Sequence, residues 1–314
     1  MSCSRATFVR ASAALPLAGL AGAAAAADTP ITIASVTNDT CTPALYALKA
    51  GLFTRAGLDV TFQGMSSGAA ASAAVAGGAA QFGLSSLGTL IVAHAHGIPF
   101  VLVAPGGLVT SDVPYAEAVV RSDSPVRTGR DLGGKVFAVP ALGDQNQVAA
   151  EAWIDKTGGD SRSVKFIELS AAATVPALLE GRVDAAQLGT PALAIALYSG
   201  KVRVLASIFD AIAPRFANVA WFSTAAYVAA NTETVRRFAD AIRTASAYAN
   251  THHAETLPLI AQYTKVDPAV LAGMTRIRFA ERLDRRDIQP LIDACARYGV
   301  IERRFDANDL IGRT

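Results

Sequence analysis

Short apolar runs alternate along the chain with segments of helical periodicity. Residues 31–36 form the first run, and Thr42 and Pro43 then begin a helix, because proline is favoured at the first helical position. Residues 58–63 alternate apolar and polar side chains and predict the next strand. Further strands are predicted over residues 81–84, 100–104, 116–121, 135–139, 164–169, 183–188, 202–208 and 217–222. This alternation predicts an α/β fold with mostly parallel sheets and helices on both faces.

Two interruptions divide this pattern. The Pro-Gly-Gly stretch at residues 105–107 and Pro114 close the first series of strands and helices, and Pro214 closes the second. After one more strand, the chain is mostly helical from Asn231 onward. We therefore expect two lobes joined by two crossings. The first lobe takes residues 28–110 and 218–314, and the second takes residues 111–217.

Residues 1–27 have the three parts of a secretory signal peptide. Two arginines supply the basic region, residues 11–24 supply the apolar region, and Ala25, Ala26 and Ala27 offer the small side chains of a cleavage site. We expect cleavage after Ala27. Residues 4–10 resemble a twin-arginine motif with alanine in place of one arginine, so the sequence leaves the export route open.

Charge and composition narrow the function classes. The chain has 28 Lys and Arg against 26 Asp and Glu, so it lacks the basic excess of a nucleic-acid-binding protein. With 52% hydrophobic and 17% charged residues it is globular. Beyond the leader, Cys41 and Cys295 stand alone without metal-ligand spacing. They could pair in an oxidising compartment or stay as two buried thiols, and the sequence leaves both open.

Motifs for catalysis do not stand out. His94 and His96 lie two residues apart on a predicted helix, so they point to different sides and cannot share a metal ion. Residues 83–87 miss the GxSxG nucleophile motif because the last residue is leucine, and we find no phosphate-binding GxxxxGK[ST] loop. We therefore expect no enzyme, no catalytic residues, no metal site and no cofactor.

Small polar clusters recur where a predicted strand is followed by a helix. The carboxyl ends of strands in open α/β sheets form the mouth of a crevice, and helix N-termini there offer unpaired N–H groups. We therefore predict that these clusters bind a ligand. The predicted ligand-binding residues are Ser35, Asn38, Ser66, Ser67, Ser85, Gln145, Asn146 and Thr190. The alternative is that each side chain only caps its own helix.

Five stretches in order carry a family resemblance. They are residues 44–53 (ALYALKAGLF), 56–60 (AGLDV), 74–83 (AVAGGAAQFG), 131–136 (DLGGKV) and 178–185 (LLEGRVDA). The chain resembles the periplasmic substrate-binding proteins of ABC importers, in the branch that binds aliphatic sulfonates, taurine, nitrate and thiamine-pyrimidine precursors. The resemblance implies a two-lobed type II binding-protein fold with two crossover strands. It also implies a periplasmic protein that holds a small-molecule solute in its cleft and delivers it to an ABC permease with its ATPase.

The junction loops also bear on the class of solute. They contain no Arg or Lys to clamp an oxyanion, whereas Asp39, Asp112 and Asp144 lie in or near them. We therefore expect a neutral or heteroaromatic solute, with an aliphatic sulfonate or other small oxyanion as the alternative. A further alternative is an enzyme like the thiamine-pyrimidine synthase, but its cysteine-rich iron motif is not found. We expect a monomer that does not bind nucleic acid.

Overall fold

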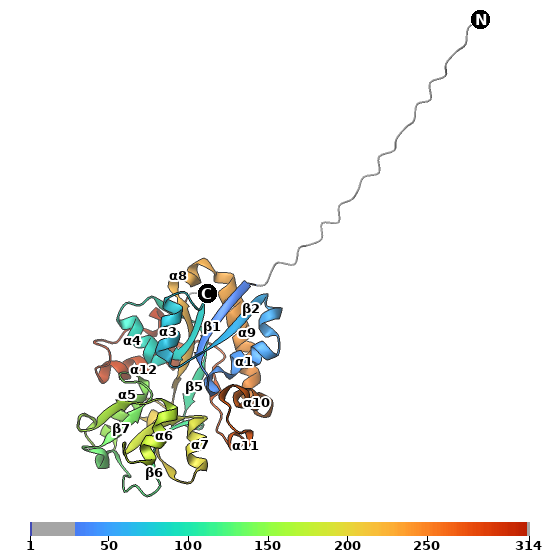
Figure 1. Cartoon of the computed structure of the whole chain (residues 1–314). Helices are drawn as coiled ribbons and strands as arrows, with labels where there is room; N and C mark the ends of the chain where they lie inside the picture. Colours follow the sequence, from blue (N-terminus) through green and yellow to red (C-terminus); the bar gives the residue numbers. More distant parts are fainter. Residues whose placement is uncertain (2–28, 313–314) are drawn as a thin grey trace.

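The first series of alternating segments, joined by one later strand, forms a five-stranded sheet in the upper part of Figure 1, which shows a computed structural model of the chain. The structure describes Met1 and residues 29–312. The predicted leader, apart from Met1, therefore lies outside the described residues. The strands of this first lobe stand in the order β2 (Leu58–Met65), β1 (Thr29–Val36), β3 (Phe82–Ser86), β12 (Val219–Thr224) and β4 (Phe100–Pro105).

A second five-stranded sheet lies below the first and forms the second lobe (Figure 1). Its strands stand in the order β10 (Val202–Ala206), β6 (Ala116–Arg121), β9 (Ala185–Gly189), β7 (Val136–Val139) and β8 (Lys165–Glu168). In the first sheet β1, β2, β3 and β4 share one direction and β12 opposes them. In the second sheet β6 is the opposed strand. The α/β class with mostly parallel sheets is confirmed.

The opposed strand of each sheet, β12 or β6, is the first strand that the chain forms after it crosses from the other lobe. The crossing strands β5 (Gly107–Thr110) and β11 (Arg215–Ala217) pair antiparallel, and β13 (Arg278–Phe279) pairs on the other edge of β5. The Pro-Gly-Gly stretch, which the sequence indicated as a break, therefore leads directly into a strand. A Cβ on Gly106 would lie 2.4 Å from the Val219 carbonyl oxygen, so the close approach of the two crossings needs glycine. The lobe boundaries at 110/111 and 217/218 stay a prediction.

Helices cover both faces of each sheet. In the first lobe Phe53 and Phe238 belong to the core on one face, and Val75 and Leu90 to the core on the other. In the second lobe α5 covers one face, and α6 and α7 cover the opposite face. The helices of the first 200 residues are α1 (Thr42–Lys49), α2 (Leu52–Arg55), α3 (Gly68–Ala76), α4 (Leu87–Ala95), α5 (Gln145–Lys156), α6 (Ala171–Leu179) and α7 (Ala192–Tyr198). None of the helices in the described part of the chain is both long and apolar enough to cross a membrane.

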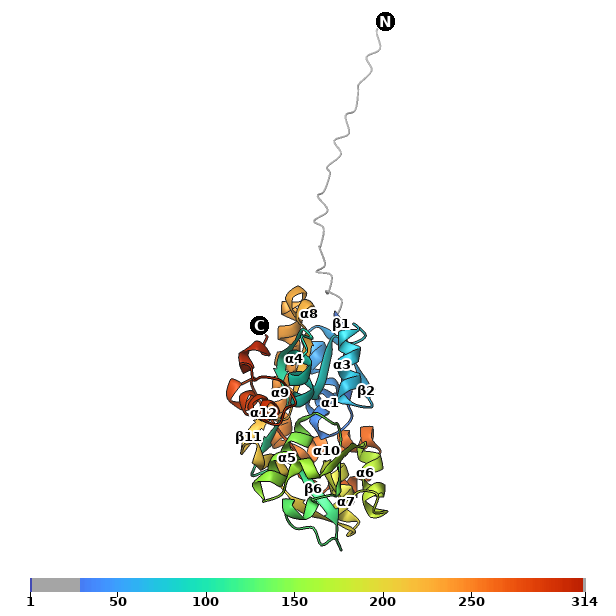
Figure 2. The same ribbon diagram turned by 90° about the vertical axis from the view of Figure 1, so that its left-hand side faces the viewer.

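The C-terminal segment is helical, as predicted, and it contacts both lobes. Figure 2 shows α12 beside α4, and α12 also contacts α5 of the second lobe. On another part of the interface α11 contacts α7, where Leu271 and Met274 pack with Ala194. The helices are α8 (Ala225–Ala230), α9 (Thr232–Thr251), α10 (His253–Thr264), α11 (Pro268–Leu271) and α12 (Arg285–Arg297). The two lobes therefore touch at more than the crossings.

Both remaining cysteines are free thiols. Cys41 lies in the core between α1 and the first sheet, whereas Cys295 lies on α12 in the core on the opposite face. Burial raises the pKa of each thiol to about 12, so both are protonated at neutral pH. The structure thus answers a question that the sequence left open, in favour of two buried thiols.

Candidate functional site

The N-termini of α4 and α5 meet across the interface between the lobes. The Gly88 N–H, at the start of α4, donates to Gln145 Oε1 at the start of α5 over 3.1 Å. Gln145 Nε2 donates to the Asn218 carbonyl oxygen over 3.0 Å and also contacts the Asn218 side-chain oxygen. Both ends of this buried amide are thus used between the lobes. The loop before α5 therefore contacts the start of α4 and Asn218 here.

Asp144 provides a second link at the same place. Its Oδ2 accepts hydrogen bonds from Ser86 Oγ over 2.5 Å and from Thr89 Oγ1 over 3.4 Å, both in the first lobe. Its Oδ1 accepts from the N–H and the side-chain amide of Asn146 over 2.7 and 2.6 Å. The pKa of the Asp144 carboxyl is raised above its ordinary value, because the effect of burial outweighs the hydrogen bonds from Ser86 and Asn146, which lower it. We refer to Ser86, Gly88, Asp144, Gln145 and Asn218 together as the interlobe latch.

Several predicted residues act as local caps in the structure. Asn38 Oδ1 accepts from the Thr40 N–H over 2.9 Å, and Ser67 Oγ accepts from the Ala70 N–H over 3.1 Å. Ser66 is exposed next to Ser67, and the buried Ser35 Oγ donates to the Val36 carbonyl over 3.0 Å. A cap can still offer a ligand its remaining polar atoms. Ligand contact by these residues therefore stays a prediction.

Two other predicted residues carry buried polar atoms without a partner. Ser85 Oγ, near the end of β3, and Thr190 Oγ1, just after β9, have no hydrogen-bond partner among residues 29–312. Only 3% of Ser85 and 7% of Thr190 is exposed. An unsatisfied buried hydroxyl costs stability, so its presence in each lobe needs an explanation. The Cβ of an alanine at position 68 would lie 2.6 Å from Ser85 Oγ, so Gly68 keeps the start of α3 open beside this hydroxyl.

Tyr115 is a candidate site residue that sequence reasoning missed. Its hydroxyl is buried and has no partner in the part of the chain that the structure describes, and its backbone oxygen accepts from the Thr190 N–H over 3.0 Å. Burial raises the pKa of Tyr115 well above 10, and the charges of Asp39 and Asp144 raise it further. Tyr115 therefore lies within electrostatic reach of loops from both lobes. The available signal was its position directly before the predicted strand 116–121.

The second missed residue is Arg276, which forms a buried ion pair with Asp39. Arg276 Nε lies 2.9 Å from Asp39 Oδ1, and only 4% and 1% of the two side chains is exposed. Asp39 also accepts from the Ile277 N–H over 2.9 Å and from Thr42 Oγ1 over 3.0 Å. The guanidinium makes further bonds to His253 O and Thr256 Oγ1. The charges of this pair are therefore satisfied within the protein.

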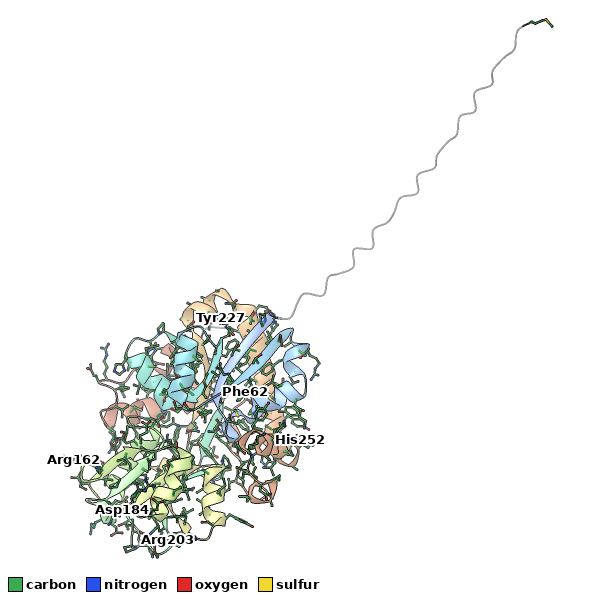
Figure 3. All side chains as sticks on the ribbon, viewed as in Figure 1. Phe62, Arg162, Asp184, Arg203, Tyr227 and His252 are labelled. Atoms are coloured by element: carbon green, nitrogen blue, oxygen red, sulfur yellow. The ribbon has the colours of Figure 1, made fainter. Side chains whose placement is uncertain are left out.

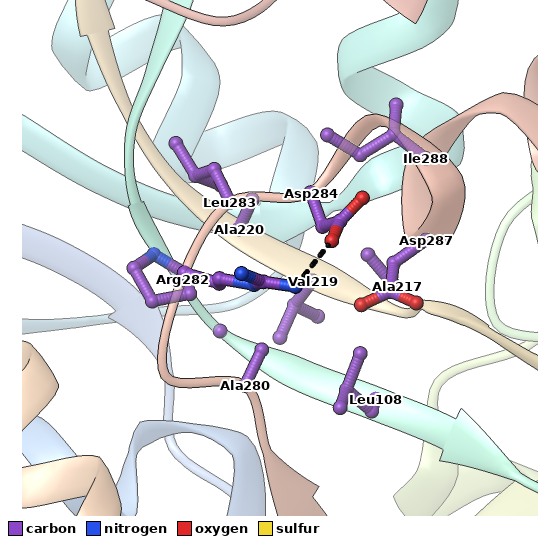
Figure 4. A pocket seen from close by; sticks show the side chains of 12 residues that line it. Leu108, Ala217, Val219, Ala220, Ala280, Arg282, Leu283, Asp284, Asp287 and Ile288 are labelled. Carbon is purple, nitrogen blue, oxygen red and sulfur yellow. Dashed lines mark hydrogen bonds and ion pairs between the residues drawn. The ribbon is translucent and has the colours of Figure 1, made fainter.

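A surface pocket lies away from these residues, near the crossing strands and the start of α12. It has a volume of about 440 Å³ and a charged lining in which Arg215 pairs with Asp287 over 2.7 Å. Figure 4 shows the adjoining apolar recess and the Arg282–Asp284 ion pair at its rim. The recess has about 10 Å³ of accessible space, which is roughly what one water molecule needs. None of the eight predicted contact residues lines either space.

The histidines do not assemble a metal site in the described residues. His252, labelled in Figure 3, lies at the end of α9, where its ring stacks on Tyr248 with centroids 3.8 Å apart. His94 packs against Phe305. Between residues 29 and 312 no group of three or more His, Cys, Asp or Glu side chains is arranged to hold a metal ion.

The fold is shared with solved binding proteins. The Escherichia coli periplasmic aliphatic sulphonate binding protein SsuA superposes with a TM-score of 0.74 at 18% identity, covering 90% of this chain and 97% of that one. The Xanthomonas axonopodis pv. citri alkanesulfonate-binding protein SsuA bound to MOPS gives 0.74 at 20% identity, with 92% and 100% covered. The Candida albicans CA3427 gene product, which has the generic periplasmic binding protein fold, gives 0.72 at 15% identity, with 91% and 96% covered.

Sequence comparison places the chain in a family although no curated protein matches it. The NMT1/THI5 like family matches residues 38–256, which is more than half of the chain. The matched region runs from Asn38, at the first strand-end loop, through the whole second lobe and into α10. It therefore contains the latch and all but one of the predicted contact residues, Ser35 being the exception. The chain belongs to the NMT1/THI5-like family and has the two-lobed fold of periplasmic binding proteins.

Proposed function

We propose that this protein is the extracytoplasmic solute-binding component of an ABC import system and holds a small neutral or heteroaromatic solute between its lobes. The observation that carries the proposal is the set of buried, unpartnered hydroxyls on Ser85, Tyr115 and Thr190. They come from both lobes, next to strand ends that the latch holds face to face. A solute with complementary polar groups would satisfy them and would favour the closed arrangement.

The charges near the interface support a solute without a strong negative charge. None of the eight predicted contact residues is cationic, and the buried Arg276 is already paired with Asp39. Asp144 adds a buried carboxyl whose bonds come from hydroxyl and amide groups. An oxyanion would enter this region without a free guanidinium to pair with.

A small oxyanion, such as an aliphatic sulfonate, is the second candidate. The start of α3 favours it, because a nine-residue helix directs its first N–H groups and the positive end of its dipole to the surface beside Ser85. Two of the similar structures are named as sulfonate-binding proteins. Hydroxyls and backbone N–H groups can bind a sulfonate without an arginine clamp.

The proposal extends to partners, location and turnover. We propose that the chain is exported through the cleaved leader 1–27, acts as a periplasmic monomer and delivers its solute to a permease with its ATPase. Binding proceeds without turnover, in contrast to an enzyme like the thiamine-pyrimidine synthase. The mass of the secreted protein tests the cleavage after Ala27, and a soluble chain that still begins at Met1 would contradict it.

A solute screen tests the function itself. Thermal shift against sulfonates, nitrate, pyrimidines, flavins and aromatic acids should reveal a ligand, since a solute at 100 times its Kd stabilises the folded state by about 2.7 kcal/mol. The bound compound should then be recovered unchanged after incubation. A product formed in proportion to the amount of protein would place the chain among enzymes, and the absence of any stabilising compound would contradict solute binding.

A further inference from the structure

Glu117 is a buried carboxyl that the family resemblance did not point to. It is the second residue of β6, where that strand begins after the first crossing, and only 3% of it is exposed. Oε1 accepts a hydrogen bond from Ser207 Oγ over 2.8 Å. Oε2 is buried and has no hydrogen-bond partner within the described residues, and no Lys or Arg there forms a salt bridge with Glu117.

The strand register places Glu117 beside the unpartnered hydroxyls. Glu117 stands opposite Leu188 in the antiparallel β6–β9 pair, and the bond from the Thr190 N–H to Tyr115 O continues this ladder beyond the strand ends. Side chains two residues apart on a strand share a face. Tyr115 and Thr190 therefore form the next opposed pair two positions from Glu117 and Leu188, just beyond the strand ends.

A buried Glu117 carboxyl with an unpartnered oxygen lowers the stability of the folded chain unless a further group binds that oxygen. A buried carboxyl normally has a cation or several donors as partners, because burial penalises its charge. Here burial raises the pKa of Glu117 to about 7, the Ser207 bond lowers it, and the charge of Asp210, itself bonded to Ser111, raises it. A fully packed core would use an apolar side chain in this place. The free oxygen thus indicates a partner from outside the chain.

We propose that Glu117 selects the solute by accepting a hydrogen bond from a cationic or neutral N–H group of that solute. Above its pKa of about 7 the Glu117 carboxylate is an acceptor only, so in that form it favours N–H donors and repels anions. The Tyr115 and Thr190 hydroxyls contact neighbouring polar atoms of the same molecule. The inference rests on the proposed function and narrows its solute class.

Two matched probe sets test the preference in calorimetry. Benzamidine, benzamide and benzenesulfonate share a ring, and ethylamine, acetamide and ethanesulfonate share a short chain, so that only the head group varies. They are measured beside the tightest compound from the solute screen. Glu117→Gln keeps the shape of the side chain but removes its charge. Glu180→Gln is the matched control, because Glu180 is exposed in the same lobe and pairs with Arg182.

The expected result is that N–H donors bind the wild type better than the matched sulfonates and that the tightest ligand carries an N–H group. Glu117→Gln should weaken that ligand by about 10- to 150-fold, the loss expected for a hydrogen bond to a charged group, and Glu180→Gln should leave it unchanged. The inference is overturned if the tightest ligand has no N–H group, or if Glu117→Gln binds that ligand as tightly as the wild type does. In either case solute binding itself is still supported. If no compound binds, the proposed function fails as well.

Discussion

Single residues at the interface carry polar groups that the fold alone does not need. Glu117 is one example, and its effect on stability can be predicted with its sign. The folded chain holds its carboxyl protonated up to a pKa of about 7, while the unfolded chain ionises near the ordinary value of 4.5. The folded state therefore binds more protons between these values, and Glu117 lowers stability as pH rises through that window.

Glu117→Gln should accordingly leave the free energy of unfolding nearly unchanged at pH 4.5 and raise it above pH 7. Urea unfolding of both proteins at several pH values measures the difference. A variant that is less stable than the wild type at pH 8 would show that the carboxylate has an internal partner and is not reserved for a ligand.

The hydroxyls of Ser85 and Thr190 give a second prediction at this scale. Ser85→Ala and Thr190→Val each remove one buried hydrogen-bonding group that has no partner within residues 29–312. Each should weaken the solute by about 2- to 13-fold, which corresponds to roughly 0.5 to 1.5 kcal/mol for one neutral hydrogen bond. Folding should be unaffected or improved. Calorimetry that shows unchanged affinity for both variants would place the solute elsewhere.

Sequence reasoning could find Ser85 and Thr190 because polar residues at strand ends follow from local patterning. It could not find Arg276, which meets Asp39 across 237 positions of the chain, a distance that no local pattern spans. Nor could it show that Gln145, predicted to contact the ligand, forms hydrogen bonds to the other lobe with both its amide oxygen and its amide nitrogen. Glu117 sits inside an apolar run, where a single acid is easily taken for an exposed strand residue.

At the scale of elements, the buried Asp39–Arg276 pair fastens the C-terminal segment to the loop before α1. Arg276→Met leaves the Asp39 carboxyl buried without its cation, which typically costs about 3 to 5 kcal/mol. The double variant Asp39→Asn, Arg276→Met removes both charges and should recover part of this loss. Chemical unfolding of the two variants measures the loss of stability in Arg276→Met and its recovery in the double variant. An Arg276→Met variant as stable as the wild type would contradict a stabilising role for the ion pair.

The start of α4 is the other element with a predictable effect. A Cβ at position 88 would lie 2.6 Å from the Gln145 backbone nitrogen, so Gly88→Val should hold the lobes apart and weaken solute binding. The cores on the far faces of the two sheets do not involve position 88, so circular dichroism should stay unchanged. Gly273→Val is the control, since its Cβ would meet nothing within 4 Å. Equal affinity for the solute in both variants would show that the latch does not contribute to closure.

The strands and helices were largely predictable, because the alternation of apolar runs and helical segments is strong in both lobes. The sequence predicts a break at the glycine-rich crossing β5, because local patterning does not show that Gly106 and Gly107 pack tightly on Val219 and Ile277. The helix predicted to begin at Thr42 ends at Lys49, and a second short helix starts after Gly51, which has a φ of +65°. Tertiary contacts decided the first case, and the left-handed conformation of Gly51 decided the second.

At the scale of the whole molecule, we predict that a bound solute joins the two lobes into one closed unit. Small-angle X-ray scattering of the full mature chain, with and without saturating solute, measures this directly through the radius of gyration. The wild type should become more compact on binding, because the solute binds the closed state better than the open one. Gly88→Val should stay extended. A wild type that binds its solute in calorimetry yet keeps the same radius of gyration would contradict a site between the lobes.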